Sequence, residues 1–313
     1  MGKLAFVFPG QGSQSVGMLA DLAAESASVE ATFSRASEVL GYDLWQLVQA
    51  GPEEQLNQTE FTQPALLSAS VACYRAAVAA GMPKPEVVAG HSLGEYSALV
   101  AAGVLQFEDA VDLVRQRGQF MQTAVPLGQG GMAAILGLDD DQVKSICDAS
   151  SDDSSQVQAA NFNAPGQVVI AGGNEALERA IDACKEAGAR RAMPLAVSAP
   201  FHSAMMAPAA EEMEAALAGV NFNQPEIAVI QNVDADYEQD ADKIRTNLVR
   251  QMCGAVLWTD TVARMAADGV DRVVECGPGK VLSGLNKRIN RDLTSLALGS
   301  AADLASASEA LGE

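Results

Sequence analysis

Short apolar runs alternate along the chain with longer segments of helical periodicity, and this alternation restricts the fold more than any other feature. Runs typical of buried strands are Leu4–Phe8, Val87–Ala89, Ala228–Ile230 and Arg272–Cys276. Helical patterns cover Thr62–Ala80, Leu93–Ala102, Phe107–Thr123, Ala204–Leu217 and Ala241–Met252. Parallel strands need long crossover connections, which are usually helices, so this order predicts an α/β domain with a mostly parallel sheet.

The middle of the chain follows a different order. Strand patterns at Met132–Leu136, Val157–Ala160, Gln167–Ala171 and Arg191–Leu195 are interrupted by helical patterns at Asp140–Ala149 and Glu175–Ala187. This β-α-β-β-α-β order predicts a ferredoxin-like lobe, entered through a glycine-rich hinge at 128–131, with a solvated acidic loop at 150–155. We therefore expect a discontinuous large domain (residues 1–127 and 198–313), an inserted small lobe (128–197), and a ligand cleft between them.

The pentapeptide Gly-His-Ser-Leu-Gly follows the predicted strand Val87–Ala89 and precedes the predicted helix Leu93–Ala102. This is the GxSxG pattern in the strand–turn–helix context of a nucleophile elbow. Such a turn exposes Ser92 at the carboxyl end of the strand, facing the backbone N–H of Leu93 and the positive end of the helix. We predict that Ser92 is a nucleophile; the alternatives are a chance match or a helix-capping serine.

A serine hydroxyl needs a base, and the chain has only 2 histidines. His91 adjoins Ser92 in the tight turn, where successive side chains diverge, so we expect it to line or support the substrate site. His202 is distant from Ser92 in sequence, as triad partners usually are, and we predict it as the base. No acidic motif identifies a third member, and a backbone carbonyl could orient the imidazole instead.

The first predicted strand ends in Phe-Pro-Gly-Gln-Gly-Ser-Gln, residues 8–14. This pattern lacks the third glycine of a GxGxxG dinucleotide site, and no GK[ST] follows to make a P-loop. In nucleophile-elbow enzymes a strand-to-helix loop supplies a second N–H to the oxyanion, and we expect Gln11 to be that donor beside Leu93. The alternative is a tight turn without a chemical role.

Arg117 lies at the edge of the apolar arc of the predicted helix Phe107–Thr123, whereas Arg115 lies on the polar face. An inward-pointing arginine requires a partner, because an unpaired buried charge costs several kcal/mol. That partner is either an internal salt bridge or the carboxylate of a substrate, which a guanidinium can grip with two hydrogen bonds.

The composition excludes several other classes. A formal net charge of −20 disfavours nonspecific binding to nucleic acid or to an anionic membrane. Five scattered cysteines without a CxxC pair, and only 2 histidines, favour free thiols and no bound metal. The sequence has neither a transmembrane-length apolar stretch nor a cleavable signal, so we expect a cytoplasmic protein.

Together these motifs resemble those of the bacterial malonyl-CoA:acyl carrier protein transacylases and, more distantly, the acyltransferase domains of polyketide and fatty-acid synthases. The resemblance covers nearly the whole chain. It rests on FPGQGSQ at 8–14, GHSLGEYSA at 90–98, Arg117, NFNAPGQ at 161–167, the segment around His202, and ECGPGKVL at 275–282. It implies a hydrolase-like α/β domain with an inserted ferredoxin-like lobe.

The resemblance also implies a role for each matching position. Ser92 would be the nucleophile, His202 its base, and Arg117 the group that binds the malonyl carboxylate. Gln11 and Leu93 would supply the oxyanion N–H groups. Gln251 would orient His202 through its backbone carbonyl.

Phe201, which precedes His202, resembles the malonyl-selecting version found in synthase domains, and Asn161 and His91 are expected to support the site. The implied substrates are malonyl-CoA and the phosphopantetheine thiol of an acyl carrier protein, with no cofactor. We expect a monomer. The alternatives are a serine esterase or thioesterase, for which an inward Arg117 has no use, and a non-catalytic carrier-binding module.

An anionic carrier would need a basic surface on this acidic chain. Basic residues gather in two segments, Lys185, Arg190 and Arg191, and Lys280, Lys287, Arg288 and Arg291. We predict that some of them bind the carrier; the alternative is a solvated charged face.

Overall fold

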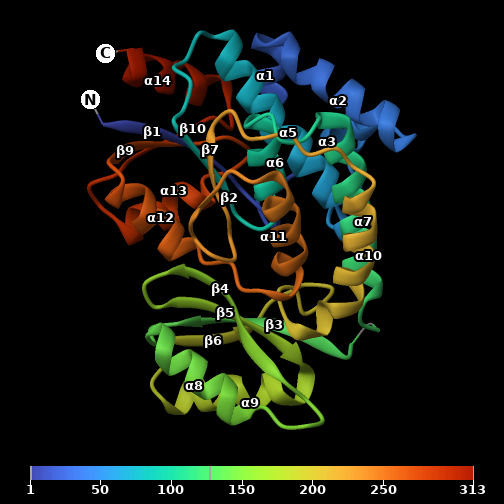
Figure 1. The fold of residues 1–313 in the computed structure, drawn as a ribbon, viewed down its shortest axis with the longest axis vertical. Helices are drawn as coiled ribbons and strands as arrows, with labels where there is room; N and C mark the ends of the chain where they lie inside the picture. Colours follow the sequence, from blue (N-terminus) through green and yellow to red (C-terminus); the bar gives the residue numbers. More distant parts are fainter. Residues whose placement is uncertain (1, 127, 313) are drawn as a thin grey trace.

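The computed structural model of the protein describes residues 2–126 and 128–312. Residue 127, the expected last residue of the first large-domain segment, lies outside the described residues. The structure contains two sheets, each with its own helices (Figure 1). The chain between about residues 130 and 195, green to yellow in Figure 1, forms the lower part of the molecule, and the segments on both sides of it form the upper part.

The larger sheet has six strands in the order β10-β9-β1-β2-β7-β8. Its pairs are parallel except for β7 with β8, so the predicted mostly parallel α/β sheet is confirmed. The strands are β1 (Lys3–Phe8), β2 (Val87–Gly90), β7 (Ala228–Ile230), β8 (Tyr237–Glu238), β9 (Val270–Glu275) and β10 (Thr294–Ala297). The two edge strands, β8 and β10, are short and were not predicted from the sequence.

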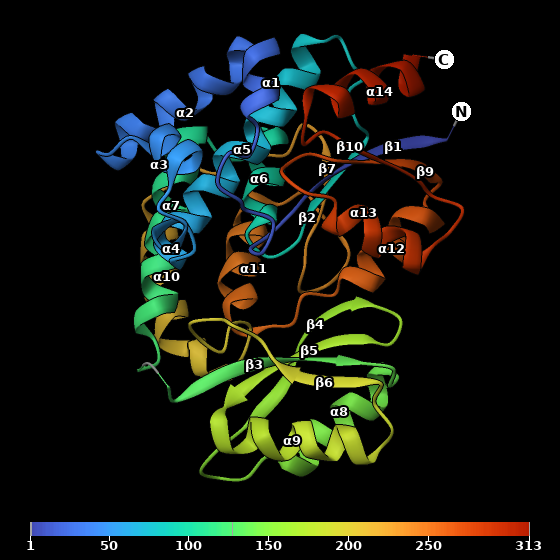
Figure 2. The ribbon, with the colours of Figure 1, turned by 180° about the vertical axis from the view of Figure 1, so that it is seen from behind.

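Helices cover both faces of this sheet because its strands are apolar on both sides. Leu4, Phe6 and Phe8 of β1 belong to one core cluster, and Ala5 and Val7 belong to the other. The first cluster includes side chains of α5 (Thr59–Ala79), α6 (Gly94–Ala101) and α7 (Phe107–Thr123), and the second includes those of α12 (Trp258–Ala267) and α13 (Val281–Ile289). Figure 2 shows α12 and α13 beside β9, away from α5 and α7.

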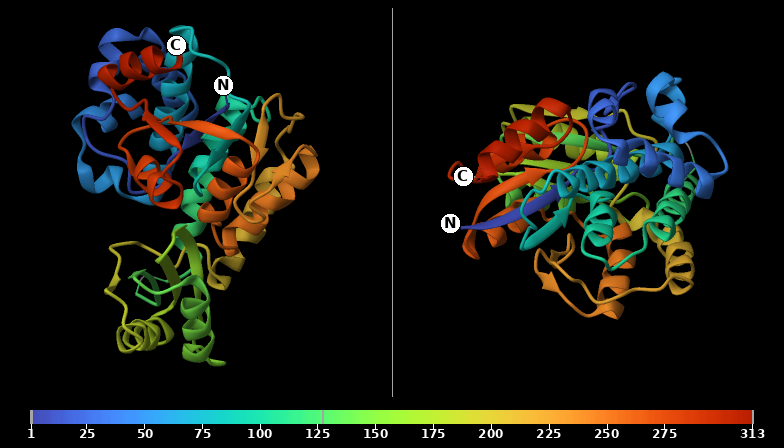
Figure 3. Two further views of the ribbon diagram at one scale, coloured as in Figure 1. Left: turned by 90° about the vertical axis from the view of Figure 1, so that its left-hand side faces the viewer. Right: turned by 90° about the horizontal axis from the view of Figure 1, so that it is seen from above.

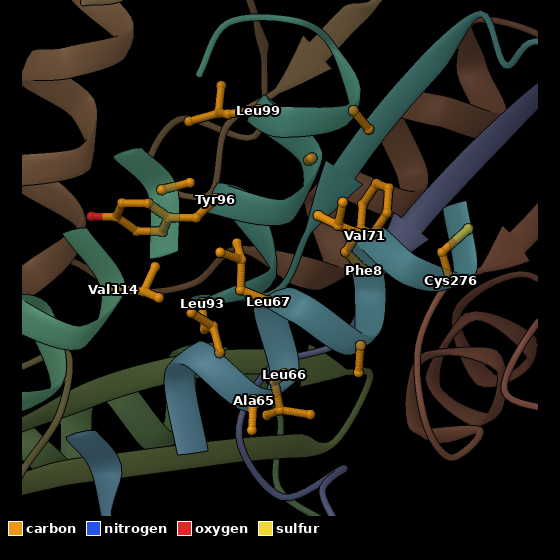
Figure 4. Close-up of a cluster of buried hydrophobic side chains, with 14 of the residues drawn as sticks. Phe8, Ala65, Leu66, Leu67, Val71, Leu93, Tyr96, Leu99, Val114 and Cys276 are labelled. Carbon is orange, nitrogen blue, oxygen red and sulfur yellow. The ribbon is translucent and has the colours of Figure 1, made fainter. Parts of the chain in front are cut away.

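Figure 4 shows part of the first cluster, in which Leu93 lies beside Leu67 of α5. The predicted bounds of α7 agree with the structure. Two further helices lie close to their predicted ranges: α10 (Ala207–Ala218), preceded by a 3₁₀ turn at Ala204–Met206, and α11 (Ala241–Cys253). Besides α12 and α13, the helices that were not predicted are α1 (Ala20–Glu25), α2 (Ala27–Leu40), α3 (Leu44–Ala50), α4 (Glu53–Leu56) and α14 (Ala301–Gly312). Among the described residues, no helix is long and apolar enough to cross a membrane.

The smaller sheet has the order β4-β5-β3-β6, and all of its pairs are antiparallel. With two helices, this order is the ferredoxin-like arrangement expected from the sequence. The elements are β3 (Gly130–Leu136), α8 (Asp140–Ser150), β4 (Val157–Ala164), β5 (Gln167–Gly173), α9 (Asn174–Glu186) and β6 (Arg191–Pro194). The predicted hinge is too long, because Gly130 and Gly131 pair with β5 as part of β3.

The small lobe contacts the segment between α11 and α12 through β4. Phe162 donates a backbone hydrogen bond to Val256, and Val256 donates one to Ala160, with distances of 2.9 Å in both cases. Figure 3 (left) shows the lobe projecting below the large sheet. Because β4 joins the two parts, residues such as Asn161 lie at the junction where the site is built.

Close packing between α5 and α7 requires a glycine at position 118. An added Cβ there would lie 2.7 Å from Cα of Glu60 and 2.7 Å from the carbonyl oxygen of Thr59. We expect Gly118→Ala to lower the free energy of unfolding by about 1–3 kcal/mol, because both clashes involve backbone.

Gly284 in α13 is a matched control, since an added Cβ would meet nothing within 4 Å. Gly284→Ala should raise stability by up to about 1 kcal/mol through helix propensity alone. Urea unfolding of both variants tests the comparison, and equal stabilities would contradict it.

Candidate active site

Ser92 occupies a sharp turn between β2 and α6. Its φ is 53°, a left-handed conformation that is uncommon for a residue with a Cβ. The flanking glycines are required by space: a Cβ on Gly90 would lie 1.9 Å from the carbonyl carbon of Gly94, and one on Gly94 would lie 2.0 Å from the carbonyl oxygen of Phe8. The turn therefore has the geometry of a nucleophile elbow.

The serine hydroxyl contacts a histidine that is distant in sequence. Oγ of Ser92 lies 2.7 Å from Nε2 of His202. The other ring nitrogen, Nδ1, lies 2.8 Å from the backbone carbonyl oxygen of Gln251. A carbonyl can only accept, so this contact requires the Nδ1–H tautomer and leaves Nε2 free to accept the serine proton.

His202 is buried, with 3% of its surface exposed. Burial, and then the positive charge of Arg117, lower the pKa of His202 to about 3. The imidazole is therefore neutral at neutral pH, as a base must be before it accepts a proton.

This depressed pKa predicts acid sensitivity. The unfolded-state pKa is about 6.5, so below that pH the unfolded chain binds a proton that the folded chain binds only near pH 3. The stability contributed by neutral His202 is complete above pH 6.5 and is lost as the pH falls.

Between pH 8 and pH 5 we expect the free energy of unfolding to fall by about 2 kcal/mol less in His202→Ala than in the unmodified protein. Urea unfolding at the two pH values measures this difference. Equal losses in the two proteins would mean that the imidazole is solvated in the folded state.

Arg117 lies beside this pair and is 1% exposed. Its Nη2 donates to Oγ of Ser92 at 3.2 Å and to Oε1 of Gln251 at 2.9 Å, and its Nη1 donates to Oε1 of Gln63 at 2.9 Å. These acceptors are all neutral, and Nε finds no hydrogen-bond partner among the described residues. Burial lowers the pKa of Arg117, while Tyr96 and Glu95 act to raise it. The guanidinium therefore has N–H groups that no acceptor among the described residues uses.

The two backbone N–H groups predicted to bind an oxyanion have no partner among the described residues. The N–H groups of Gln11 and Leu93 make no hydrogen bond within residues 2–126 and 128–312. Gln11 lies in the loop after β1, and both Gln11 and Ser92 line the same cavity. Backbone N–H groups without a partner are suited to bind a developing negative charge.

The cavity between the two parts has a volume of about 580 Å³. Phe201, Asn161 and His91 line it, together with Ser92 and His202. His91 does not contact the serine hydroxyl; its Nε2 lies 2.7 Å from Oδ1 of Asn163, and burial lowers the pKa of His91. Among the described residues, no group of three or more His, Cys, Asp or Glu side chains could hold a metal ion.

Three polar residues of the site were not singled out from the sequence. Gln63 binds Arg117, and Asn232 accepts a hydrogen bond from the Ser92 N–H at 2.7 Å. Glu95, 1% exposed, accepts from the side chains of Gln231 and Gln251 at 2.8 Å each. The available sequence signal was Glu95 itself, a charged residue in the otherwise apolar helix α6. Burying such a residue requires several hydrogen-bond donors around it.

The fold and this geometry define a class: α/β proteins with a serine–histidine pair at a nucleophile elbow, which transfer or hydrolyse acyl groups. The model of the acyl transferase domain family matches residues 5–306 of the chain. The malonyl CoA-acyl carrier protein transacylase of Escherichia coli (strain K12) is 56% identical over 309 residues, which cover 99% of this chain and 100% of that protein. The chain therefore belongs to the malonyl CoA-acyl carrier protein transacylase family.

Solved structures agree with this membership. An acyl carrier protein S-malonyltransferase from Vibrio cholerae matches with a TM-score of 0.95 and 56% identity, covering 97% of this chain and 99% of that chain. A malonyl-transacylase solved in complex with its type II PKS acyl-carrier protein matches with a TM-score of 0.96 and 54% identity, covering 98% and 99%.

Proposed function

We propose that this protein transfers a malonyl group from malonyl-CoA to the phosphopantetheine thiol of an acyl carrier protein, in fatty-acid biosynthesis, through a malonyl-Ser92 intermediate. The observation that carries the proposal is the position of Arg117, a buried guanidinium 3.2 Å from the serine hydroxyl. In a malonyl ester, a single methylene separates the ester carbonyl from the free carboxylate. An acyl group attached to Ser92 therefore has its carboxylate within reach of the guanidinium.

The reaction proceeds in two half-reactions. Nε2 of His202 accepts the Ser92 proton as Oγ attacks the thioester carbonyl, and the Gln251 carbonyl stabilises the imidazolium through Nδ1–H. The oxyanion is bound by the N–H groups of Gln11 and Leu93. Its collapse breaks the C–S bond, and the coenzyme thiolate takes the proton from His202. The carrier thiol then attacks the malonyl ester by the reverse path, so no cofactor is required.

The carrier is proposed to dock at α13. Val281, Leu282 and Leu285 of this helix line the cavity, and Lys287 and Arg288 on the same helix are exposed. An acidic carrier placed there would bring its thiol to the cavity mouth.

We expect charge reversal at Lys287 and Arg288 to raise the KM for the carrier about tenfold at low salt and less at high salt. The other candidate pair, Arg190 and Arg191, is also exposed but does not line the cavity. Reversal of that pair is the matched comparison, and a larger effect there would move the docking surface to β6.

The alternative activity is hydrolysis by a serine esterase or thioesterase. The discriminating experiment incubates the protein with malonyl-CoA and holo carrier protein and follows both products. Malonyl carrier should accumulate. Release of free malonate at a similar rate would favour the hydrolase instead.

A further inference from the structure

We infer that Glu95 is the counter-ion of Arg117, although the side-chain amide of Gln251 lies between the two charges. This indirect pairing keeps the guanidinium charged and leaves it available to a substrate carboxylate. The inference deepens the proposed function and rests on it. It makes Glu95 a positioning residue that acts through Gln251 and Arg117.

Two hydrogen bonds connect the Glu95 carboxylate to the Arg117 guanidinium through Gln251. Oε2 of Glu95 accepts from Nε2 of Gln251 at 2.8 Å, and Oε1 of Gln251 accepts from Nη2 of Arg117 at 2.9 Å. The amide therefore lies between the two charges. Each of the three side chains is buried, with 1%, 0% and 1% exposed for Glu95, Gln251 and Arg117.

The hydrogen bonds of the Gln251 amide hold it in one orientation. Nε2 of Gln251 also donates to the backbone carbonyl of Ser92 at 3.1 Å. Both of its hydrogens thus face acceptors on one side, and the opposite side must present the oxygen to Arg117. A flipped amide would set its oxygen against the Glu95 carboxylate and the Ser92 carbonyl. Glu95 therefore helps to keep an acceptor, and not a donor, against the guanidinium.

The surroundings of Glu95 suit a carboxylate. The side chain of Gln231 donates at 2.8 Å, and the backbone N–H of Asn232 donates at 3.1 Å. Three donors and no acceptor meet the two oxygens. Burial nevertheless raises the pKa of Glu95 to about 7, and the donors and Arg117 oppose that rise. Burying the Glu95 carboxylate costs free energy, and the opposite charge of the nearby Arg117 guanidinium offsets part of that cost.

The indirect pairing of Glu95 with Arg117 has a consequence for substrate choice. A carboxylate in direct contact with Arg117 would compete with a malonyl carboxylate for the same donors. A distant one would leave a buried cation uncompensated whenever the site is empty. The interposed amide avoids both outcomes, because its neutral oxygen accepts from Nη2 of Arg117 without cancelling the charge of the guanidinium.

The first test is Glu95→Gln, with thermal unfolding measured in the presence and absence of free malonate. We expect a lower Tm than in the unmodified protein, and a larger rise in Tm on adding malonate, because the added anion then becomes the only counter-charge. The malonyl-to-acetyl ratio of Ser92 loading should stay the same or rise. A malonate-induced rise equal to that of the unmodified protein would overturn the inference.

Glu275→Gln is the matched control. Glu275 is also buried, 1% exposed, but it accepts from backbone N–H groups of Leu282 and Ser283 at 3.0 and 2.7 Å. Its loss should lower the Tm without changing the malonate-induced rise. A change of the same size as in Glu95→Gln would reduce the role of Glu95 to general stability.

The second test is the double variant Glu95→Gln/Gln251→Glu, which keeps the total charge and moves the carboxylate into direct contact with Arg117. It stays informative even when Glu95→Gln alone fails to fold. We expect the malonate-induced rise in Tm to disappear and the malonyl-to-acetyl loading ratio to fall at least tenfold. A double variant with the original ratio would refute indirect pairing. An unmodified protein that does not prefer malonyl would instead refute the proposed function itself.

Discussion

Replacing Ser92 by alanine should abolish the covalent malonyl intermediate and lower transfer by at least about 10⁴-fold, because the proposed reaction has no other nucleophile. The variant should retain the fold, since the hydroxyl is partly exposed and only an oxygen is lost. Intact-mass measurement after brief exposure to malonyl-CoA detects the intermediate directly.

Ser97 offers a control within the same helix. Its hydroxyl is buried and has no hydrogen-bond partner among the described residues. Ser97→Ala should therefore acquire the malonyl group at the normal rate. A malonyl adduct on the Ser92→Ala protein would place the nucleophile elsewhere.

Replacing Arg117 by alanine should slow malonyl transfer roughly 30- to 1000-fold, while acetyl transfer survives or rises. The loss corresponds to a transition state that is less stable by about 2–4 kcal/mol. The two acyl groups differ in what they offer the guanidinium. A malonyl group has a carboxylate that binds Arg117 directly, whereas an acetyl group has none and leaves the free N–H groups of Arg117 without a substrate partner. Removing the guanidinium therefore removes a favourable contact for malonyl and none for acetyl.

Arg115 is the comparison for this variant. It lies two residues away on α7 and pairs at the surface with Asp112 of the same helix. Arg115→Ala should leave both transfer rates within about twofold, since a surface ion pair contributes little. An unchanged malonyl-to-acetyl ratio in Arg117→Ala, measured by competition between the two thioesters, would disprove carboxylate binding.

The sequence predicted the elements that depend on local patterns. The apolar arc of Phe107–Thr123 set the bounds of α7 and placed Arg117 at its edge, where the structure buries it. The strand, glycines and serine of residues 87–94 predicted the elbow from spacing alone. Helices between residues 20 and 56, and the edge strand β10, were not predicted, because short elements of mixed polarity depend more on packing than on periodicity.

The sequence by itself determined which groups this protein has for chemistry: one serine in an elbow, two histidines and an arginine on the edge of an apolar face. Only the tertiary structure decided how they combine. The side chain of Gln251 reaches the backbone of Ser92 across 159 residues, and that contact links Arg117 to Glu95. Helical and strand periods arise from neighbours a few residues apart, whereas a buried polar group takes whichever partner the topology brings within hydrogen-bond distance.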